Sequence, residues 1–276
     1  MKFRYSRTYR GKLQAVILDW AGTTQDYGCY APAGVFVEVF RKHGVEISMS
    51  QAREPMGTPK KDHIRMISKI AEVAKKWQEH HGRACSEDDI EQLYREFIPM
   101  QMECIADFAD LIPGTKDAIA RFRKRGLKIG STTGYNREMT EVVLAEAKRQ
   151  GFVPDSCVCA SDVPAGRPAP WMCLVSAMQM QVHPLESIVK IGDTIPDIEE
   201  GLNAGMWSVG VAKTGNEIGL NEQEINALAP EELERRLRDV RRRMYQAGAH
   251  YVVDAIGDCD SVLDEIECRL AQGEKP

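Results

Sequence analysis

Short apolar runs alternate with helical patterns along most of this chain, and this alternation restricts its fold more than any other feature. The first run, LQAVIL at residues 13–18, ends abruptly at Asp19. Apolar runs of this kind are typical of parallel strands that are buried on both faces of a sheet. Further runs of the same character occupy residues 127–132, 156–160, 188–191 and 207–211, with a shorter one at 251–253.

Helical patterns separate these runs. Residues 115–125 place Ala118, Ile119 and Phe122 on one face, and Gly126 follows at a position where helices commonly end. Residues 138–149 and 168–180 predict two further helices. Strands and helices that alternate in this way predict an α/β fold with a Rossmann-like, open and mostly parallel sheet covered by helices on both faces.

The pattern changes between Tyr27 and Asp107, where no convincing strand occurs. Helical patterns occupy residues 31–42, 51–54, 59–79 and 86–107 instead. A helical insert of about eighty residues after the first strand predicts a second domain. The sequence therefore predicts an N-terminal extension at residues 1–12, a core formed by residues 13–26 and 108–276, and a helical cap domain at residues 27–107.

Composition and charge exclude several classes of protein. The formal net charge of −5 argues against a general nucleic-acid binder. The arginine-rich segment 231–246 carries Leu233, Leu237, Val240 and Met244 at helical spacing, so an amphipathic helix with a solvated face is expected there. No apolar run approaches the ~18 residues of a membrane helix, and the basic start lacks the apolar segment of a secretion signal. Eight scattered cysteines without a C-x-x-C pattern predict free thiols in the cytoplasm.

Polar side chains follow the predicted strands at the points where they end. Asp19 follows the first strand, Thr133 the second and Asp193 the fourth, with Asp197 four residues later. Arg167 lies in the loop PAGRP between the last two of these. Because ligands bind beyond the carboxyl ends of parallel strands, we expect these side chains to meet at one edge of the sheet.

This set of side chains suits phosphoryl chemistry. Neighbouring carboxylates repel each other unless a cation binds between them, and oxygen ligands beside a phosphate suit Mg²⁺. The hydroxyl of Thr133 and the amide of Gly134 can donate to phosphate oxygens, and Arg167 can neutralise phosphoryl charge. Asp19 can then attack phosphorus and form an aspartyl phosphate.

The order of these four motifs resembles that of the haloacid dehalogenase superfamily, over about residues 13–26 and 108–255. The resemblance implies the nucleophile at Asp19, the hydroxyl motif at Thr133, the cation at Arg167, metal ligands at Asp19, Asp193 and the carbonyl of Ala21, and support of the metal site by Asp197.

One position departs from the superfamily pattern. Its phosphatases usually carry a second aspartate, a general acid and base, where this chain has Ala21. A methyl group cannot transfer protons. Either the chain is not a catalyst, or another group activates the leaving group.

The segment MGTPKKDH at residues 56–63 of the insert offers such a group. Thr58 is a good helix N-cap and Pro59 suits the first helical position, which places Lys60 in the first turn. The helix dipole and the neighbouring Lys61 are expected to lower the pKa of Lys60. A neutral amine can form a Schiff base with an aldehyde, and His63, on the same helix face, can carry protons.

Nearly the whole chain, from about residue 15 to 253, resembles the phosphonoacetaldehyde hydrolase family within this superfamily. The strings DWAGTT, DYGCYAP, PMG, GSTTGY, SDVPAGRP, PWMC and GDT carry the resemblance. It implies hydrolysis of the carbon–phosphorus bond of phosphonoacetaldehyde to acetaldehyde and phosphate, in 2-aminoethylphosphonate degradation, with Mg²⁺ as cofactor. It also implies a homodimer through the cap helices, the Schiff-base lysine at Lys60, and substrate-side roles for Met56, His63, Cys29, Tyr135 and Gly134.

Two other functions remain open on the residues alone. The chain could hydrolyse phosphate esters with the same fold, or it could bind a phosphorylated ligand without catalysis, because Ala21 replaces the usual acid. A nicotinamide dehydrogenase is disfavoured because no G-x-G-x-x-G follows the first strand.

Overall fold

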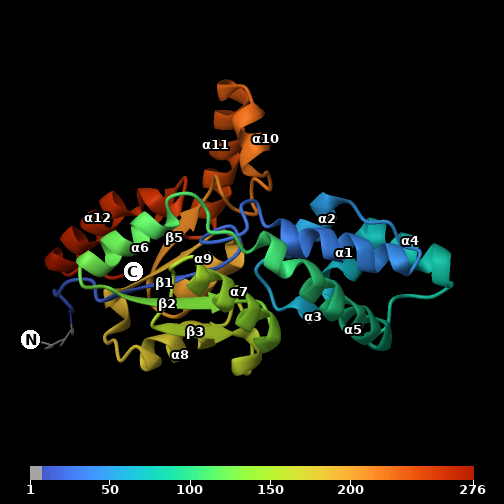
Figure 1. Ribbon diagram of the computed structural model, residues 1–276, viewed down its shortest axis with the longest axis horizontal. Helices are drawn as coiled ribbons and strands as arrows, with labels where there is room; N and C mark the ends of the chain where they lie inside the picture. The colour runs from blue at the N-terminus through green and yellow to red at the C-terminus, as the bar shows by residue number, and fades with distance from the viewer. Residues whose placement is uncertain (1–7) are drawn as a thin grey trace, which may run out of the picture.

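The computed structural model describes residues 8–276, so residues 1–7 of the predicted N-terminal extension lie outside the described residues. A parallel sheet with helices on both faces forms one part of the molecule, and a group of helices extends from one end of it (Figure 1). None of the helices formed by residues 8–276 has both the length and the apolar character needed to cross a lipid bilayer.

Six strands form the sheet, in the order β3-β2-β1-β4-β5-β6, and every neighbouring pair is parallel. This arrangement confirms the predicted fold class, and each predicted strand is present within two residues of its expected bounds. The strands are β1 (Ala15–Leu18), β2 (Lys128–Thr133), β3 (Ser156–Cys159), β4 (Ile188–Gly192), β5 (Trp207–Val211) and β6 (Tyr251–Val253).

Alternate side chains of β1 point to opposite faces of the sheet, and each face has its own apolar cluster. Val16 and Leu18 pack with residues of α6 (Thr115–Lys124), α7 (Arg137–Arg149) and α12 (Cys259–Gln272). Ala15 and Ile17 pack with residues of α8 (Trp171–Gln179) on the other face. The sheet is therefore buried on both sides, which explains why its strands read as continuous apolar runs.

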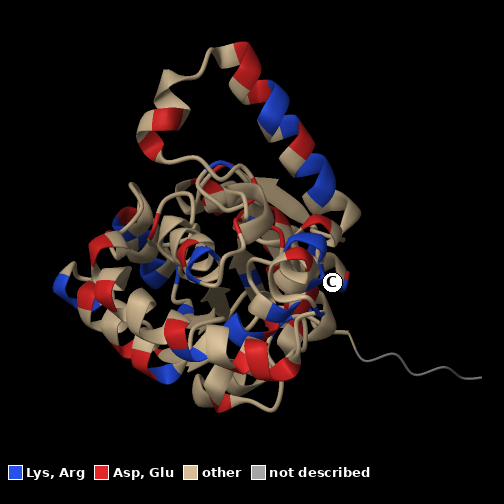
Figure 2. Ribbon diagram, turned by 90° about the vertical axis from the view of Figure 1, so that its right-hand side faces the viewer, with Lys and Arg blue, Asp and Glu red and all other residues tan. Residues whose placement is uncertain are grey.

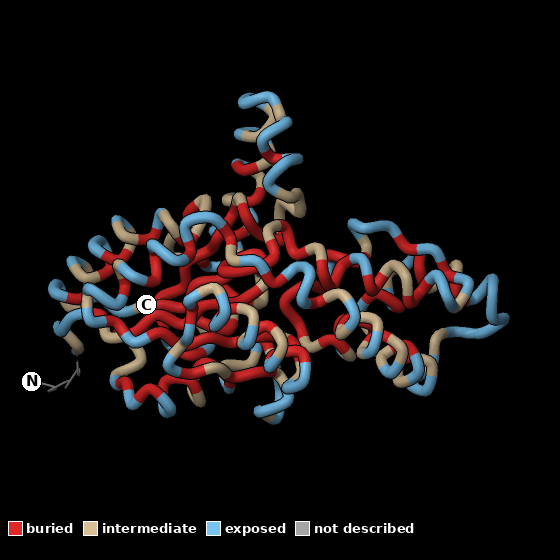
Figure 3. The backbone as a smooth tube through the Cα atoms, in the orientation of Figure 1, coloured by how far each residue is buried: buried red, intermediate tan, exposed pale blue. Residues whose placement is uncertain are grey.

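The helical group consists of α1 (Tyr30–Lys42), α2 (Met49–Arg53), α3 (Lys60–Lys69), α4 (Ala71–His81), α5 (Glu87–Cys104) and a short 3₁₀ helix (Ile105–Phe108). Phe36, Phe40, Ile64, Trp77 and Phe97 are fully buried at its centre. Figure 3 shows that buried positions run along the strands and continue into the junction with these helices. This continuity places the junction, and the site described below, away from solvent.

The predicted helix at residues 59–79 is wrong as a single element. Ile70 has an extended ψ of 127° and starts a second helix, α4. The break allows Val73 and Trp77 of α4 to join the cluster that already contains Ile64 and Ile67 of α3. The predicted helix at 86–107 likewise ends as an α-helix at Cys104. All eight cysteines lie within residues 8–276 and are free, as expected.

Two helices project from the sheet, α10 (Glu222–Ala227), which was not predicted, and α11 (Pro230–Gln246). Leu237, Val240 and Met244 of α11 are buried, which agrees with the expected amphipathic helix. Figure 2 shows basic and acidic residues interleaved along α11. Arg235 and Arg236 both pair with Glu232 of the same helix, so its arginines are partly neutralised locally.

Candidate active site

The carboxyl ends of β2, β1 and β4 lie side by side, because β1 pairs with both of the others. The chain moves from β1 towards β3 and later returns to build β4 to β6 on the other side of β1. In sheets of this order, ligands bind at the point where the direction reverses. Asp19, Thr133 and Asp193 stand at these three ends, and all three side chains are buried.

A cavity of about 20 Å³ lies at this point, between the sheet and the helical group. Residues from both parts of the chain line it, and among them are all of the predicted site residues except His63 and Asp197. Its wall consists of Asp19, Ala21, Cys29, Pro32, Met56, Gly57, Lys60, Thr133, Gly134, Tyr135, Arg167, Asp193 and Thr194.

Three aspartates on the sheet side form a buried acidic group. Asp19, Asp193 and Asp197 each offer an oxygen within 4.8 Å of the others. Burial raises the pKa of Asp19, and it raises that of Asp193 well above its usual value, with further increases from Asp19 and Asp197. A divalent cation would offset this repulsion, and carboxylate oxygens are ligands that Mg²⁺ prefers. The side chains therefore fit the predicted metal, with Asp19 and Asp193 on the cavity wall.

Arg167 stands at the centre of a charge network behind these aspartates. Its guanidinium lies 2.5 Å from Asp19, 3.1 Å from Asp197 and 3.0 Å from Glu200. Burial alone would raise the pKa of Asp197, but Arg167 and Lys190 hold it below its usual value. Asp197 is thus an ionised partner of the cations and lies behind the cavity wall, which matches a supporting position.

The sequence analysis missed two residues of this network, Lys190 and Glu200. Lys190 lies in the middle of β4, 2.8 Å from Asp197 and 3.2 Å from Glu200, and donates to the hydroxyl of Thr132. A signal was present in the sequence, because a lysine inside a strand that is buried on both faces requires acidic partners. Glu200, three residues after Asp197, lies on the same helix, α9 (Ile195–Asn203), and supplies one of them.

Asp193 accepts hydrogen bonds from neighbours in two separate segments, the loop after β1 and the loop that contains Asn216. Its Oδ2 accepts hydrogen bonds from the backbone N–H of Asn216 at 2.7 Å and from the thiol of Cys29 at 3.2 Å. Its Oδ1 accepts a hydrogen bond from Thr23 at 3.3 Å. The sequence analysis predicted Cys29 as a substrate-side residue but missed Asn216, because no motif marks the loop that contains it.

Lys60 supplies the only cationic side chain that the helical group contributes to the described wall of the cavity. It is the first residue of α3, it is buried, and its Nζ lies 4.9 Å from the centre of the Tyr135 ring and 5.7 Å from that of Phe36. Burial lowers the pKa of Lys60 to about 8. The predicted direction of the shift is confirmed.

Of the two predicted causes of this shift, the contribution of Lys61 is wrong and that of the helix dipole stays a prediction. Burial is its largest cause, and the cation that contributes to it is Arg167. Lys61 points elsewhere and pairs with Glu91 of α5. Helix α3 begins one residue later than predicted, with Pro59 at the cap position, while the hydroxyl of Thr58 bonds back to the carbonyl of Pro55.

His63 does not reach the cavity wall. Its ring stacks on Phe36 with a centroid separation of 3.9 Å, and its Nε2 lies 2.8 Å from the carbonyl oxygen of Ala52. Burial, with the nearby charge of Lys60, lowers the pKa of His63 well below its usual value. The ring is therefore neutral and donates to Ala52, with the hydrogen on Nε2.

The remaining predicted residues form the less charged parts of the wall. Ala21, Cys29 and Met56 belong to one small apolar cluster with Ala33. Gly134 allows the helical group to approach the sheet part closely, because a Cβ at this position would lie 2.9 Å from the carbonyl oxygen of Thr58. The cavity thus has a charged wall on the sheet side and a largely apolar wall on the helical side.

Comparison with known proteins places this geometry among hydrolases. The family model of haloacid dehalogenase-like hydrolases matches residues 13–205. A phosphonoacetaldehyde hydrolase from Syntrophobacter fumaroxidans is 49% identical, and the alignment covers 99% of both chains. A phosphonoacetaldehyde hydrolase-like protein from the same organism is 48% identical with the same coverage. The crystal structure of a phosphonoacetaldehyde hydrolase-like protein from Oleispira antarctica superposes with a TM-score of 0.97, at 42% identity and full coverage of both chains.

Proposed function

The chain belongs to the phosphonoacetaldehyde hydrolases of the haloacid dehalogenase-like family and is an enzyme that hydrolyses carbon–phosphorus bonds, and from this premise we propose that its substrate is phosphonoacetaldehyde. The products would be acetaldehyde and phosphate, in the degradation of 2-aminoethylphosphonate. The observation that carries the proposal is the presence of a buried amine, Lys60, and a buried carboxylate, Asp19, on opposite walls of one small cavity.

In the first step, Lys60 forms an imine with the aldehyde. Its pKa of about 8 leaves a useful fraction of free amine at neutral pH, whereas a solvated lysine is almost fully protonated. The amine nitrogen attacks the carbonyl carbon, and water leaves. Protonation of the imine nitrogen gives an iminium ion, which can accept an electron pair.

In the second step, an oxygen of Asp19 attacks phosphorus and the carbon–phosphorus bond breaks. The electron pair of that bond forms a carbon–carbon double bond while the iminium nitrogen becomes neutral, which gives an enamine and an aspartyl phosphate. Without the iminium, the leaving group would be the enolate anion of acetaldehyde, which leaves less readily than a neutral enamine. A proton then adds to the enamine carbon, and water hydrolyses both the resulting imine and the aspartyl phosphate.

Arg167, Thr133 and the amide of Gly134, which line the cavity, would hold the phosphoryl oxygens. Arg167 contacts Asp19 directly, so its guanidinium would exchange part of this contact for the phosphoryl group. Asp19, Asp193 and the carbonyl of Ala21 would hold Mg²⁺. When bound, Mg²⁺ would offset the charge of the carboxylates and of the phosphoryl oxygens.

This mechanism makes the alanine at position 21 compatible with catalysis. A phosphate-ester hydrolase must protonate a leaving oxygen, which is the task of the missing aspartate. Here the proton goes to carbon, on the side of the helical group. We retain His63 as a residue that assists this proton transfer. Because its ring does not face the cavity, the transfer would require a movement of the ring or an intervening water molecule.

We further propose that residues 27–107 act as a cap domain that opens to admit the substrate. A cavity of about 20 Å³ has room for one or two water molecules, and phosphonoacetaldehyde is larger. Closure then brings Lys60 to Asp19 and excludes bulk water. A homodimer formed through the cap helices and a location in the cytoplasm complete the proposal.

Borohydride reduction in the presence of phosphonoacetaldehyde tests the proposal. We expect acetaldehyde and phosphate to be released without borohydride, and a covalent adduct on Lys60 to be found by peptide mass spectrometry after reduction. An adduct on Lys61 would show that the wrong lysine is assigned. Asp19→Ala should abolish phosphate release, and retained release would mean that another group is the nucleophile.

The same experiment separates the two alternative functions. A phosphate-ester hydrolase would turn over simple phosphate esters at a rate that borohydride does not change. A non-catalytic binder would bind phosphate without turnover of either compound. The identity of 49% with a phosphonoacetaldehyde hydrolase favours catalysis. A relative at 48% identity is named only hydrolase-like, so the substrate must be decided by the assay with phosphonoacetaldehyde.

A further inference from the structure

Few polar side chains link the helical group to the rest of the molecule. Within residues 8–276, no ion pair joins residues 27–107 to the sheet part, and three pairs of side chains form hydrogen bonds between them. These pairs are Cys29 with Asp193, Tyr30 with Glu224, and Arg53 with Asn216. The third pair has no part in the mechanism above.

Arg53 is an unusual residue to find at this junction. It is the last residue of α2, it is only 9% exposed, and no carboxylate of the described chain forms an ion pair with it. Its Nη1 donates to the carbonyl of Gly28, and its guanidinium lies 4.9 Å from the Tyr30 ring centre. Its Nε and Nη2 have no hydrogen-bond partner within residues 8–276. A buried cation with so few partners is unfavourable for stability and calls for a functional explanation.

Asn216 connects this arginine to the acidic group of the active site. Its Oδ1 accepts from Nη1 of Arg53 at 3.3 Å, and its Nδ2 donates to the backbone carbonyl of Arg53 at 3.2 Å. Its own backbone N–H donates to Oδ2 of Asp193 at 2.7 Å. One residue is therefore bonded to the helical group through its side chain and to the proposed metal ligand through its backbone.

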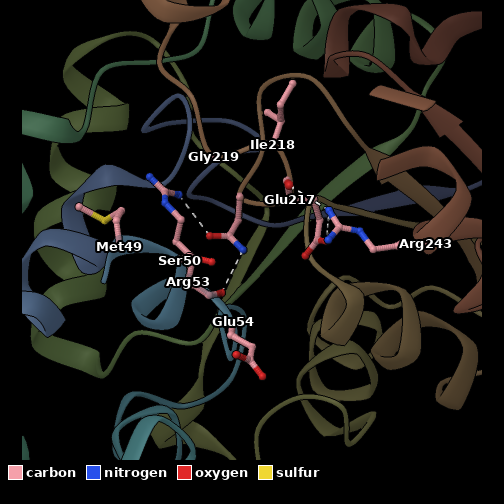
Figure 4. A pocket seen from close by; sticks show the side chains of 9 residues that line it. Met49, Ser50, Arg53, Glu54, Glu217, Ile218, Gly219 and Arg243 are labelled. Atoms are coloured by element: carbon pink, nitrogen blue, oxygen red, sulfur yellow. Dashed lines mark hydrogen bonds and ion pairs between the residues drawn. The ribbon is translucent and has the colours of Figure 1, made fainter. Parts of the chain in front are cut away.

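The loop around Asn216 is shaped for this double contact. A Cβ at Gly215 would lie 2.4 Å from Cβ of Asp193, so only glycine lets the loop approach that aspartate. On the other side, a Cβ at Gly219 would lie 3.2 Å from Cδ of Arg53. Figure 4 shows Arg53 and Arg243 on opposite sides of a hollow of about 440 Å³ that opens beside this loop. Thr214 and Glu217, on either side of this part of the loop, are held by Gly22 and Arg243, whereas the side chain of Asn216 is held by Arg53.

We propose that Asn216 is a positioning residue, and that its contact with Arg53 couples closure of the cap to the orientation of Asp193. With the cap closed, Arg53 holds the side chain of Asn216, and the backbone N–H of Asn216 directs Oδ2 of Asp193. When the cap opens, α2 withdraws Arg53 and the loop loses both side-chain hydrogen bonds. The metal site would then be complete only around a closed cavity.

The proposal rests on the proposed role of Asp193 in holding Mg²⁺, and its test uses Mg²⁺ binding in the absence of substrate. In Arg53→Lys and Asn216→Ala, titration calorimetry with MgCl₂ should give an affinity about tenfold weaker than in the unaltered protein, as for other partners of metal ligands. The double variant should be no weaker than either single variant, because both remove the same link. Arg53→Lys keeps the positive charge, so simple electrostatics predicts no change for it.

A second measurement follows the cap itself. Cys29 is buried at the junction and Cys268 is exposed, so the alkylation of Cys29 by iodoacetamide relative to Cys268 reports opening. In metal-free buffer, both variants should alkylate Cys29 several-fold faster. Tyr30→Phe is the matched control, because it removes another hydrogen bond between the two parts, to Glu224, and leaves Asn216 untouched. It should bind Mg²⁺ normally.

Different failures point to different errors. Unchanged Mg²⁺ affinity in Arg53→Lys and Asn216→Ala would overturn the coupling, and so would a double variant whose loss equals the product of the single losses. An equal loss in Tyr30→Phe would show general loosening of the cap and would also overturn it. If the unaltered protein binds no Mg²⁺, the metal role of Asp193 is wrong, and unchanged Cys29 alkylation in the variants would then overturn the coupling to closure as well.

Discussion

Lys190 and Lys60 are both buried next to the same acidic group, yet their pKa values shift in opposite directions. Burial lowers the pKa of both amines. At Lys190, contacts with Asp197 and Glu200 outweigh burial and the charge of Arg167, so its pKa is raised. At Lys60, no carboxylate lies within ion-pair distance in the described chain, and the pKa falls to about 8.

This difference shows that a buried lysine has a lowered pKa only where acidic partners are not in contact with it. The charged wall on the sheet side keeps Arg167 and Lys190 charged, which the proposed binding of a phosphoryl group requires. The helical side, with Phe36 near the amine, offers no such partner, and the nearest group that faces it from the sheet part is the Tyr135 ring. The proposed imine formation requires this lack of partners. In the proposed mechanism the two walls have opposite tasks, because one is rich in counter-charges and the other lacks them.

Replacing the amine on the apolar wall should have the largest effect. Lys60→Arg keeps the charge but cannot form an imine, so kcat/KM for phosphonoacetaldehyde should fall at least roughly a thousandfold, as for other covalent catalysts. Steady-state assays of phosphate release measure this, with circular dichroism to check the fold. Lys61→Arg serves as the matched control, since Lys61 pairs with Glu91, and it should retain nearly full activity. Comparable losses of kcat/KM in both variants would contradict a specific role of Lys60.

Removing the central cation of the charged wall should have the next largest effect. Arg167→Met leaves Asp19, Asp197 and Glu200 with less compensation, so the free energy of unfolding at pH 7 should fall by about 3–5 kcal/mol. Urea unfolding followed by fluorescence measures the loss.

The control for this variant is Arg137→Met, which breaks a partly exposed pair with Asp162. Its free energy of unfolding should change by less than about 1 kcal/mol. If Arg167→Met had the same free energy of unfolding as this control, Arg167 would not be needed to stabilise the buried carboxylates of the charged wall.

The pH dependence of imine formation should reveal the lowered pKa of Lys60. The neutral amine is the reactive form, so below about pH 8 the rate should rise about tenfold per pH unit and then level off. The measurement is the rate of borohydride trapping with a non-phosphorylated aldehyde as probe. A rate that continues to rise towards pH 10 would mean that Lys60 behaves as an ordinary solvated lysine.

The smallest expected effect concerns stability and has opposite signs at the two lysines. The folded protein disfavours the charged form of Lys60, so this penalty is fully present below about pH 8 and disappears as the pH rises towards 10.5. Lys60→Met should therefore raise the free energy of unfolding at pH 7, by at most about 3 kcal/mol, and by much less at pH 10.

Lys190→Met is the comparison variant and should instead lower the free energy of unfolding, because it removes the partner of Asp197 and Glu200. Urea unfolding at pH 7 and pH 10 measures both variants. If Lys60→Met instead lowered the free energy of unfolding at pH 7, the charged amine of Lys60 would have stabilising partners that its surroundings do not indicate.

The sheet and its polar edge were predictable because their signals are local. An apolar run such as residues 13–18 reports burial on both faces, and a polar residue directly after it, such as Asp19, must stand at the sheet edge whatever the rest of the chain does. The structure brings Asp19, Thr133, Arg167 and Asp193 to one cavity, as their positions relative to the strands predicted. Lys60, which was assigned from the motif of the insert and the family resemblance, lines the same cavity. The catalytic roles assigned to them stay predictions.

Other features were not predictable because they depend on contacts between distant segments. The break at Ile70 allows packing within the helical group. The residues next to Ile70 include no glycine or proline that would signal the end of a helix. His63 shares a helix with Lys60, but the position of Phe36 turns it away from the cavity. The link between Arg53 and Asn216 joins residues that are 163 positions apart.

The sequence by itself determined the alternating core, the helical insert and the chemical groups available to the site, since periodicity and strand-end chemistry are properties of neighbouring residues. Only the tertiary structure decided which of two buried lysines has a lowered pKa and which backbone N–H contacts Asp193. The reason is physical: a pKa and a hydrogen bond depend on distances of a few ångströms to partners in other segments, and these distances exist only once the chain has folded.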